Sequence, residues 1–297
     1  MDNLTFVTSE FAKARNRLFS IAYRMLGSTA DAEDMIQETY LRWHQANKNE
    51  IRSPEAWLVS VLTRLCIDRL RSATLERETY TGPWLPEPLF TEIPASPEEN
   101  LELAADLSMA FMLLLERLAP VERAAFLLHD VFDFEYPEVS RILEKSEAAC
   151  RQVVHRARER VRRDRPRFHP TRDELFSLIE RFNSAVIAGD EETVLSMFAE
   201  DATLTSDGGS KVNAARKVVL GRQRIARLFL VLDRKLSGRM TRSIVNINGE
   251  PGLVTYLDGK PLSATSFEMD GERIAALYHV LNPDKLKGIC ESEASTD

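Results

Sequence analysis

The chain has 297 residues, of which 44% are hydrophobic and 29% charged, and its formal net charge is −7. These values are ordinary for a globular protein and predict two or three domains. No run approaches the roughly 18 uninterrupted apolar residues of a membrane span, and the first residues lack the pattern of a secretory signal. We therefore expect a cytoplasmic protein without a membrane partner.

The three cysteines, Cys66, Cys150 and Cys290, are far apart and have no CxxC spacing. This pattern argues against a disulfide framework and a zinc site, and it predicts reduced, mostly buried thiols. We expect no metal and no cofactor. Net charge alone would point away from nucleic acid, but charge acts as a local field and has to be read segment by segment.

Residues 1–72 have the apolar spacing of three helices. The first, of about four turns, ends at Gly27. Ser28 or Thr29 can cap the second, which has acids in its first turn. Ser53-Pro54 begins a third helix that should run from Glu55 to Arg71. We predict a compact all-α domain here.

Residues 73–105 contain many prolines and glutamates, which exclude a regular helix over much of the stretch and predict a flexible linker. The linker contains the run WLPEP, residues 84–88. An exposed Trp84-Leu85 pair in a linker usually docks on a neighbouring surface, although it could also cover only a local apolar gap.

Residues 106–170 return to helical periodicity in three segments, with breaks at Ala119-Pro120 and around 144–146. A short helix ending near Leu143, a three-residue turn and a long basic helix capped by Ser146 form the order of a helix-turn-helix. Cys150, Val153, Val154, Ala157 and Val161 share one face of the long helix and should be buried. The opposite face should read DNA, because arginines there can contact phosphates and guanine; its candidates are Glu147, Arg151, Gln152, His155, Arg156 and Arg158.

Residues 171–297 predict an α+β domain. Two helices, over 172–188 and 191–199, precede five β-type runs over 202–205, 240–247, 253–257, 263–268 and 274–280. Asn248-Gly249, Asp258-Gly259 and Asp270-Gly271 separate the later runs and are strong hairpin signals. We expect a curved antiparallel sheet.

The run DAEDMIQET, residues 31–39, in a chain of two helical lobes joined by a linker, resembles the extracytoplasmic-function (ECF) sigma factors of the sigma-70 family. The resemblance covers roughly residues 11–167 and implies RNA polymerase core and promoter DNA as partners. It implies that the helix over 31–42 binds the large polymerase subunit, through Asp31, Asp34, Gln37, Glu38 and Arg42.

The same resemblance implies that the helix over 53–71 opens the minus-ten promoter element and that the helix at Ser146 reads the minus-thirty-five element. The loop before the third helix would hold a flipped base, which has to be captured once it leaves the stack. The minus-ten candidates are Asn47, Lys48, Asn49, Arg64, Asp68, Arg69 and Arg71.

The C-terminal half resembles the SnoaL-like (NTF2-like) extension of one ECF subgroup, a cone of helices on a curved sheet. The motifs are WLPEP in the linker, DGGSK at 207–211 and NPDKL at 282–286. Ser210 stands where the subgroup usually has a third glycine, so a role that needs positive φ there is in doubt. The resemblance implies a fused regulator that contacts the sigma lobes or the linker, through Trp84, Leu85, Pro86, Asp207, Gly208, Gly209, Lys211, Asn282, Pro283, Asp284 and Lys285.

Two alternatives stay open. The first is a polymerase-independent helix-turn-helix regulator that senses a small molecule through the C-terminal domain. The second is a cyclase or isomerase with a DNA-binding segment, for which Asp201, Asp207, His279 and Asp284 are the polar candidates. A single histidine in this half and the lack of a nucleophile–base pair argue against the enzyme.

Overall fold

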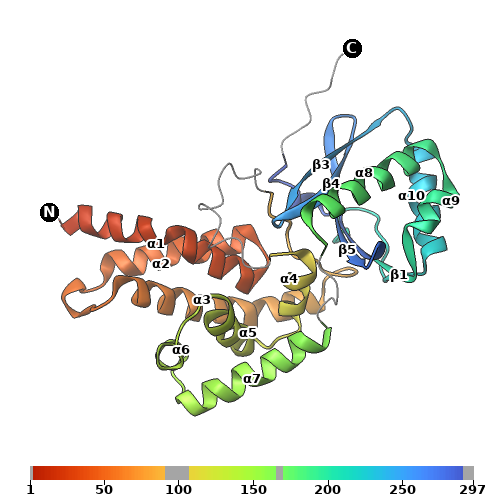
Figure 1. The fold of residues 1–297 in the computed structure, drawn as a ribbon. Helices are drawn as coiled ribbons and strands as arrows, with labels where there is room; N and C mark the ends of the chain where they lie inside the picture. Colours follow the sequence, from red (N-terminus) through yellow and green to blue (C-terminus); the bar gives the residue numbers. More distant parts are fainter. Residues whose placement is uncertain (1–2, 91–106, 165–169, 290–297) are drawn as a thin grey trace. The chain divides into compact units, whose positions relative to one another are not determined.

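The computed structural model describes residues 3–90, 107–164 and 170–289. The chain folds into two compact units (Figure 1). Among the described residues, the N-terminal unit holds 3–78, 107 and 111–164, and the C-terminal unit holds 79–90, 108–110 and 170–289. The predicted fold class, two groups of helices followed by an α+β region with a curved sheet, is confirmed.

The first group of helices comprises α1 (Asn3–Leu26), α2 (Thr29–Gln45) and α3 (Pro54–Glu78). Gly27, with a φ of +66°, ends α1, and Ser28 caps α2 by accepting a hydrogen bond from the Asp31 N–H. The helix α3 runs beyond its predicted end at Arg71. Residues 73–78 have good helix formers, and the Arg77 side chain near the end of α3 is held by an ion pair with Glu116.

The second group comprises α4 (Met109–Glu116), α5 (Pro120–Phe126), a π-helical turn (Leu127–Val131), α6 (Tyr136–Leu143) and α7 (Glu147–Asp164). The turn between α6 and α7 contains Glu144 at a φ of +53°, and the Ser146 hydroxyl accepts a hydrogen bond from the Ala149 N–H. The predicted helix-turn-helix is confirmed. Its predicted apolar face is buried, whereas Arg165 and Arg167 lie outside the described residues.

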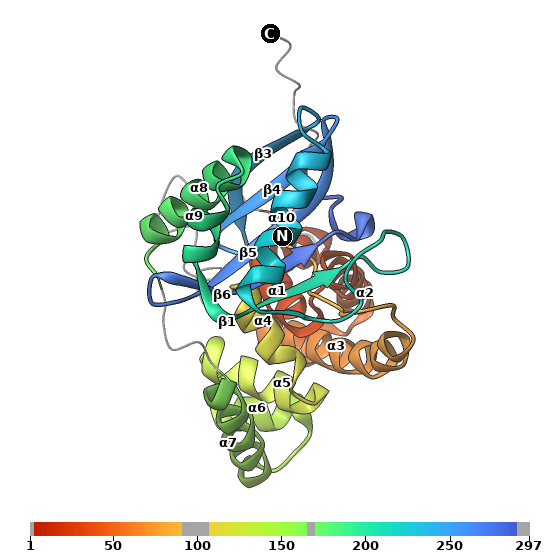
Figure 2. The same cartoon turned by 90° about the vertical axis from the view of Figure 1, so that its right-hand side faces the viewer.

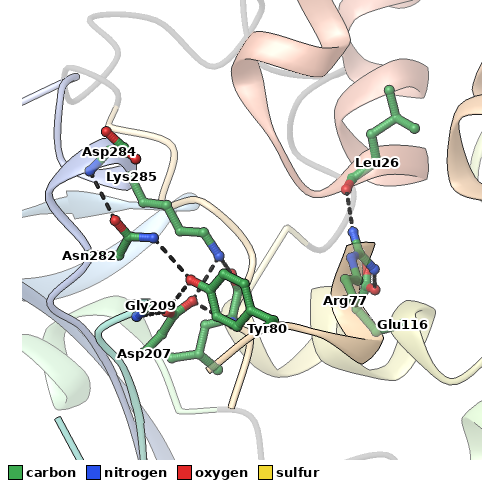
Figure 3. Close-up of polar contacts among 10 residues, drawn as sticks. Leu26, Arg77, Tyr80, Glu116, Asp207, Gly209, Asn282, Asp284 and Lys285 are labelled. Carbon is green, nitrogen blue, oxygen red and sulfur yellow. Dashed lines mark hydrogen bonds and ion pairs between the residues drawn. The ribbon is translucent and has the colours of Figure 1, made fainter. Parts of the chain in front are cut away.

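The two groups of helices pack against each other within the N-terminal unit, through α1 and α3 on one side and α5, α6 and the π-helical turn on the other. The side chain of Arg123, 2% exposed, donates to the Met25 carbonyl oxygen at 2.5 Å and forms an ion pair with Glu116. Glu116 also pairs with Arg77, which donates to the Leu26 carbonyl (Figure 3). A buried charge costs several kcal/mol unless it is paired. The charges of this cluster are paired only while the two groups of helices stay packed together.

The C-terminal unit begins its regular structure with α8 (Arg172–Ala188) and α9 (Glu191–Ser196). Six strands follow: β1 (Phe198–Asp207), β2 (Val219–Leu220), β3 (Met240–Ile247), β4 (Glu250–Leu257), β5 (Lys260–Asp270) and β6 (Arg273–Val280). They form one sheet in the order β2-β1-β6-β5-β4-β3. With α10 (Arg222–Lys235), α8 and α9 cover the concave face of this curved sheet (Figure 2).

The sheet is mixed, because β1 and β6 run parallel while the other neighbours are antiparallel, as predicted. A helix and four strands separate β1 from β6 along the chain, so no tight hairpin forces those two strands to be antiparallel. Two predicted hairpins have positive φ at both central residues, Asn248-Gly249 and Asp258-Gly259, which is the geometry of a type I′ turn. The prediction omitted β2 and α10, and it extended α9 into residues that begin β1.

The core of the C-terminal unit lies between the helices and the sheet. Phe182 of α8 makes edge-to-face contacts with Phe198, Phe229 and Phe267. The helices in the described part of the chain include none that is long and apolar enough to cross a membrane. Cys66 and Cys150 are buried free thiols, as predicted, and burial raises the pKa of the Cys66 thiol. Cys290 lies outside the described residues.

Candidate functional site

The Asp207 carboxylate, at the end of β1, is completely buried and accepts hydrogen bonds from four donors. Its Oδ1 accepts from the Tyr80 hydroxyl at 2.6 Å and from the Gly209 N–H at 3.1 Å. Its Oδ2 accepts from the Leu85 N–H at 2.9 Å and from Lys285 Nζ at 2.7 Å. A buried carboxylate with this number of donors, one of them a cation, is compensated for its loss of water. We call Asp207 and these four partners the Asp207 hub (Figure 3).

The hub unites all three motifs of the C-terminal half and the linker. Lys285, the last residue of the 3₁₀ turn Pro283–Lys285, also donates to the Leu85 carbonyl oxygen at 2.5 Å. Its ammonium lies 4.2 Å from the centre of the Trp84 ring, a cation–π distance. The main chain of Leu85 is therefore held at both its N–H and its carbonyl oxygen, and its side chain is fully buried.

Tyr80 is a hub residue that the sequence did not reveal. Its hydroxyl donates to Asp207 and accepts from Asn282 Nδ2 at 2.9 Å. Burial, followed by the hydrogen bond to the Asp207 carboxylate, raises the pKa of the Tyr80 hydroxyl, so this group stays protonated and remains a donor. Its only signal in the sequence is its position, four residues before Trp84.

The two glycines of the DGGSK motif are required for different reasons. A Cβ at Gly208 would lie 2.6 Å from Ala214 Cβ and 2.7 Å from the Val212 carbonyl oxygen. Gly209 has a φ of +57°, and a Cβ there would lie 2.9 Å from Asn282 Nδ2. Ser210 is exposed and its φ is not positive, so the third position places no demand for glycine. Nearby, Lys211 pairs with Asp284 at 2.5 Å on the surface.

A second contact fixes the linker to the sheet. The Leu89 N–H donates to Asn248 Oδ1 at 3.1 Å, and the Asn248 N–H donates to the Leu89 carbonyl oxygen at 2.8 Å. Phe90 then forms a β-bridge with Ile247 at the end of β3. Pro86 and Pro88 are buried between the two contacts. The part of the predicted flexible linker from Thr79 to Phe90 therefore lies on the C-terminal unit, while residues 91–105 of it lie outside the described residues.

The candidates for catalysis do not form a catalytic group. His279 Nδ1 lies 2.8 Å from the Thr265 hydroxyl, and burial lowers the pKa of the imidazole to about 4. Asp207 belongs to the hub, Asp284 pairs with Lys211 and Lys287, and Asp201 is exposed on β1. Among the residues that the structure describes, no cluster of side chains has the make-up of a metal site.

In the N-terminal unit, several residues predicted to contact the polymerase or DNA already have intramolecular partners. Asp31 accepts from Arg69 Nε at 3.0 Å, and Glu38 accepts from Arg42 at 2.8 Å. Asp68 pairs with Arg71. Asp34, Gln37, Asn47 and Asn49 are exposed.

Lys48 caps the C-terminus of α2 by donating to the Trp43 and Ala46 carbonyl oxygens, and it also lies over the Trp43 ring. Burial of the ammonium lowers the pKa of Lys48.

On α7, all of the predicted DNA-reading side chains are exposed. Arg151 stacks on the Tyr136 ring at 4.4 Å and pairs with Glu147. Arg158 is held in a two-pronged ion pair by Asp130, and Arg156 contacts Glu122 at 3.5 Å. Gln152 and His155 lie in the same exposed stretch.

Two family models match the chain, "Sigma-70 region 2" over residues 11–76 and "Sigma-70, region 4" over residues 108–161. With the helical fold and the helix-turn-helix, they define a sigma factor of RNA polymerase. The chain is 38% identical over 291 residues to the ECF RNA polymerase sigma factor SigJ of Mycobacterium tuberculosis, covering 94% of this chain and 93% of that protein. It is 25% identical over 283 residues to the probable ECF sigma factor SigI of the same species, covering 94% of each chain.

The crystal structure of the Mycobacterium tuberculosis ECF sigma factor SigJ is similar over 96% of this chain and all of that chain, with a TM-score of 0.76 and 36% identity. The chain belongs to the ECF RNA polymerase sigma factors. It is an alternative sigma factor to which a C-terminal α+β domain is fused, and the resemblance inferred from the sequence is confirmed.

Proposed function

We propose that the C-terminal domain regulates promoter-specific transcription by holding the linker between the two sigma regions. The observation that supports this most directly is the capture of Leu85, whose N–H is bonded to Asp207 and whose carbonyl oxygen is bonded to Lys285. The linker joins the two parts of the chain that have to reach separate promoter elements. Fixing it limits the distance that those parts can span, because each free residue adds at most about 3.3–3.6 Å.

The packing of the N-terminal unit supports an inhibited state. Arg64, a minus-ten candidate on α3, donates to the Ile142 carbonyl oxygen of α6 at 3.1 Å and pairs with Glu144 at 2.9 Å. Elements named minus-ten and minus-thirty-five lie about 25 base pairs apart, or roughly 85 Å at 3.4 Å per base pair. Two DNA readers in contact cannot occupy both elements, so the groups of helices must separate before a promoter is read.

We assign the polymerase core and the promoter to the surfaces that the sequence predicted. On α2, the exposed Asp34 and Gln37 would contact the large polymerase subunit directly, while Asp31, Glu38 and Arg42 would first exchange their present partners. Around α3, Asn47 and Asn49 are accessible to a flipped base. Lys48, Arg64, Asp68, Arg69 and Arg71 have intramolecular contacts that DNA binding would have to replace, and of these only the contact of Arg64 joins the two groups of helices.

On α7, we propose that Arg151, Gln152 and His155 read bases of the minus-thirty-five element, because they lie near the start of the helix and are exposed. Glu147 orients Arg151. Arg156 and Arg158 lie further along the helix, and their ion pairs with Glu122 and Asp130 suit contacts with the phosphate backbone rather than base readout.

We further propose that the C-terminal domain acts without catalysis. His279 bonds to a threonine hydroxyl, and its polar neighbours provide no activated nucleophile. The domain would then act by binding the linker and by releasing it when a signal arrives.

The test is transcription by purified core polymerase with the full chain, on fragmented genomic DNA from the source organism, with transcript 5′ ends sequenced. Lys285→Met removes the ammonium that contacts both Asp207 and Leu85 while keeping a long apolar stem. We expect the same promoters as with the unsubstituted chain, at several-fold higher output. Lys287→Met is the matched control, because this exposed lysine pairs with Asp284 and not with Asp207 or Leu85. Unchanged output from folded Lys285→Met, with the linker shown to be released, would contradict regulation through this contact.

A further inference from the structure

A cavity of about 180 Å³ lies beside the Asp207 hub, within the C-terminal unit. Its lining consists of the loop of residues 208–216, Ser206 of β1, and Thr81 and Gly82 of the linker. Gly82 has a φ of +81°, and a Cβ there would lie 3.6 Å from the Arg216 Cα. The linker is therefore packed directly on the loop at the edge of the cavity.

The lining is rich in hydrogen-bond donors and cations. The lining residues include Thr81, Ser206 and Ser210, which carry hydroxyls, together with Asn213, Lys211 and Arg216, but no aspartate or glutamate. The charge of Lys211 is compensated by an ion pair with Asp284, a residue that does not line the cavity. In the described part of the chain, Arg216 forms no ion pair. Its guanidinium is thus available to an incoming anion.

We propose that this cavity binds a small oxyanion, such as the phosphate or carboxylate group of a metabolite. Arginine binds both groups through two parallel hydrogen bonds, and hydroxyl donors supply the remaining contacts. The lack of a carboxylate in the lining disfavours a metal ion, because hard cations need oxygen ligands that carry charge. Ser210 adds a hydroxyl at the motif position where a third glycine would supply none.

The ligand would also contact the linker and stabilise its docked position. Thr81 and Gly82 lie between Tyr80 and Leu85, both of which are bonded to Asp207. A ligand that touches loop and linker together binds the docked linker better than the released one, and it stabilises the docked state by linkage. This consequence for transcription rests on the proposed regulatory function, whereas binding itself does not.

Binding is tested by calorimetric titration of the full chain with inorganic phosphate, sulfate, acetate and citrate in separate experiments. We expect one site per chain for at least one of the four anions, and their ranking distinguishes a phosphate site from a carboxylate site. Arg216→Gln should weaken binding tenfold or more, because a hydrogen bond to a charged group is lost. Lys217→Gln is the matched control, since it makes the same charge change on the next residue, which does not line the cavity.

Equal loss in the two variants would mean general attraction to a basic loop and would overturn the site, as would the absence of saturable binding by all four anions. Ser210→Gly should weaken binding less than Arg216→Gln does. If Ser210→Gly bound the anion as tightly as the unsubstituted chain, the role of the serine hydroxyl would be overturned. Transcription is measured separately with the best anion. Binding without an effect on transcript output would contradict the regulatory proposal and leave the binding site in place.

Discussion

Asp207 and Leu85 are 122 positions apart in the chain, yet the Asp207 carboxylate accepts the Leu85 N–H at 2.9 Å inside a fully buried site. The carboxylate thereby fixes the main chain of the linker rather than a replaceable side chain. A substitution at Leu85 changes the packing of the linker, but only a change at Asp207 or Lys285 removes the polar contacts that hold its backbone.

Asp207→Asn should destabilise the C-terminal unit by about 3 kcal/mol or more, because it leaves the buried Lys285 ammonium without a counter-charge and turns an amide N–H₂ toward other donors. Urea unfolding followed by circular dichroism measures this change. Asp284→Asn, which removes a carboxylate from the exposed pair with Lys211, should change stability much less, because solvent screens an exposed ion pair. Equal costs for the two variants would show that the hub is no stronger than a surface ion pair.

Asn248→Gly should release the end of the linker without disturbing the hairpin. Glycine accepts the φ of +55° at this position but lacks the carbonyl oxygen that binds the Leu89 N–H. We expect faster hydrogen exchange at the Leu89 amide, measured by mass spectrometry. Asp258→Gly is the matched control, because it lies at φ +50° in the neighbouring turn and contacts Arg239, not the linker. Unchanged exchange at Leu89 would mean that other contacts are sufficient to hold it.

The sequence predicted the helices other than α10, five of the six strands within a few residues, and the motifs that meet at Asp207. Its errors arise where tertiary contacts decide the outcome. In α10 the buried Ile225 and Ala226 are followed by the continuous apolar run LFLVL, a pattern that periodicity alone cannot assign to a helix rather than a strand. The helix α3 continues to Glu78 because Arg77 finds Glu116, a partner 39 positions away. Asn248 was recognised as a turn residue. Its side chain also accepts a hydrogen bond from the Leu89 N–H, and this contact with a linker remote in sequence could not be predicted from the local pattern.

Glu144→Gln should favour separation of the two groups of helices. It removes the charge that pairs with Arg64 but keeps the Arg64 side chain, which can contact DNA once the groups of helices separate. The pair is exposed, so the expected gain in the open state is a few-fold, which corresponds to less than about 1 kcal/mol. Fluorescence energy transfer between labels on α2 and α7 reports the distance, and promoter output from the same variant should rise. Arg64→Ala should open the unit as well but lower promoter output, since a minus-ten candidate is lost.

Arg151→Ala and Arg158→Ala should affect DNA binding differently. If Arg151 reads a base, its loss costs about 1–3 kcal/mol for the correct minus-thirty-five sequence and little for unrelated DNA. Arg158 is expected to contact phosphate, so its loss should weaken binding to all sequences and reduce the salt dependence by about one unit of slope. Binding of the polymerase holoenzyme to promoter DNA at several salt concentrations measures both quantities. Loss of sequence preference in Arg158→Ala but not in Arg151→Ala would reverse the assignment of the two side chains.

The stability of the C-terminal unit should fall between pH 6.5 and pH 4 because of His279. Burial lowers the pKa of its imidazole to about 4, against 6.5 for an exposed histidine. In this range the unfolded chain binds a proton that the folded chain does not, so acid favours unfolding. The contribution of this residue is complete above pH 6.5 and declines at lower pH by at most about 1.4 kcal/mol per pH unit. Chemical unfolding at several pH values measures the slope. His279→Asn can keep a polar contact with Thr265 but has no proton to bind, so the slope should become shallower in this variant. An identical slope would assign the acid sensitivity to the carboxylates instead.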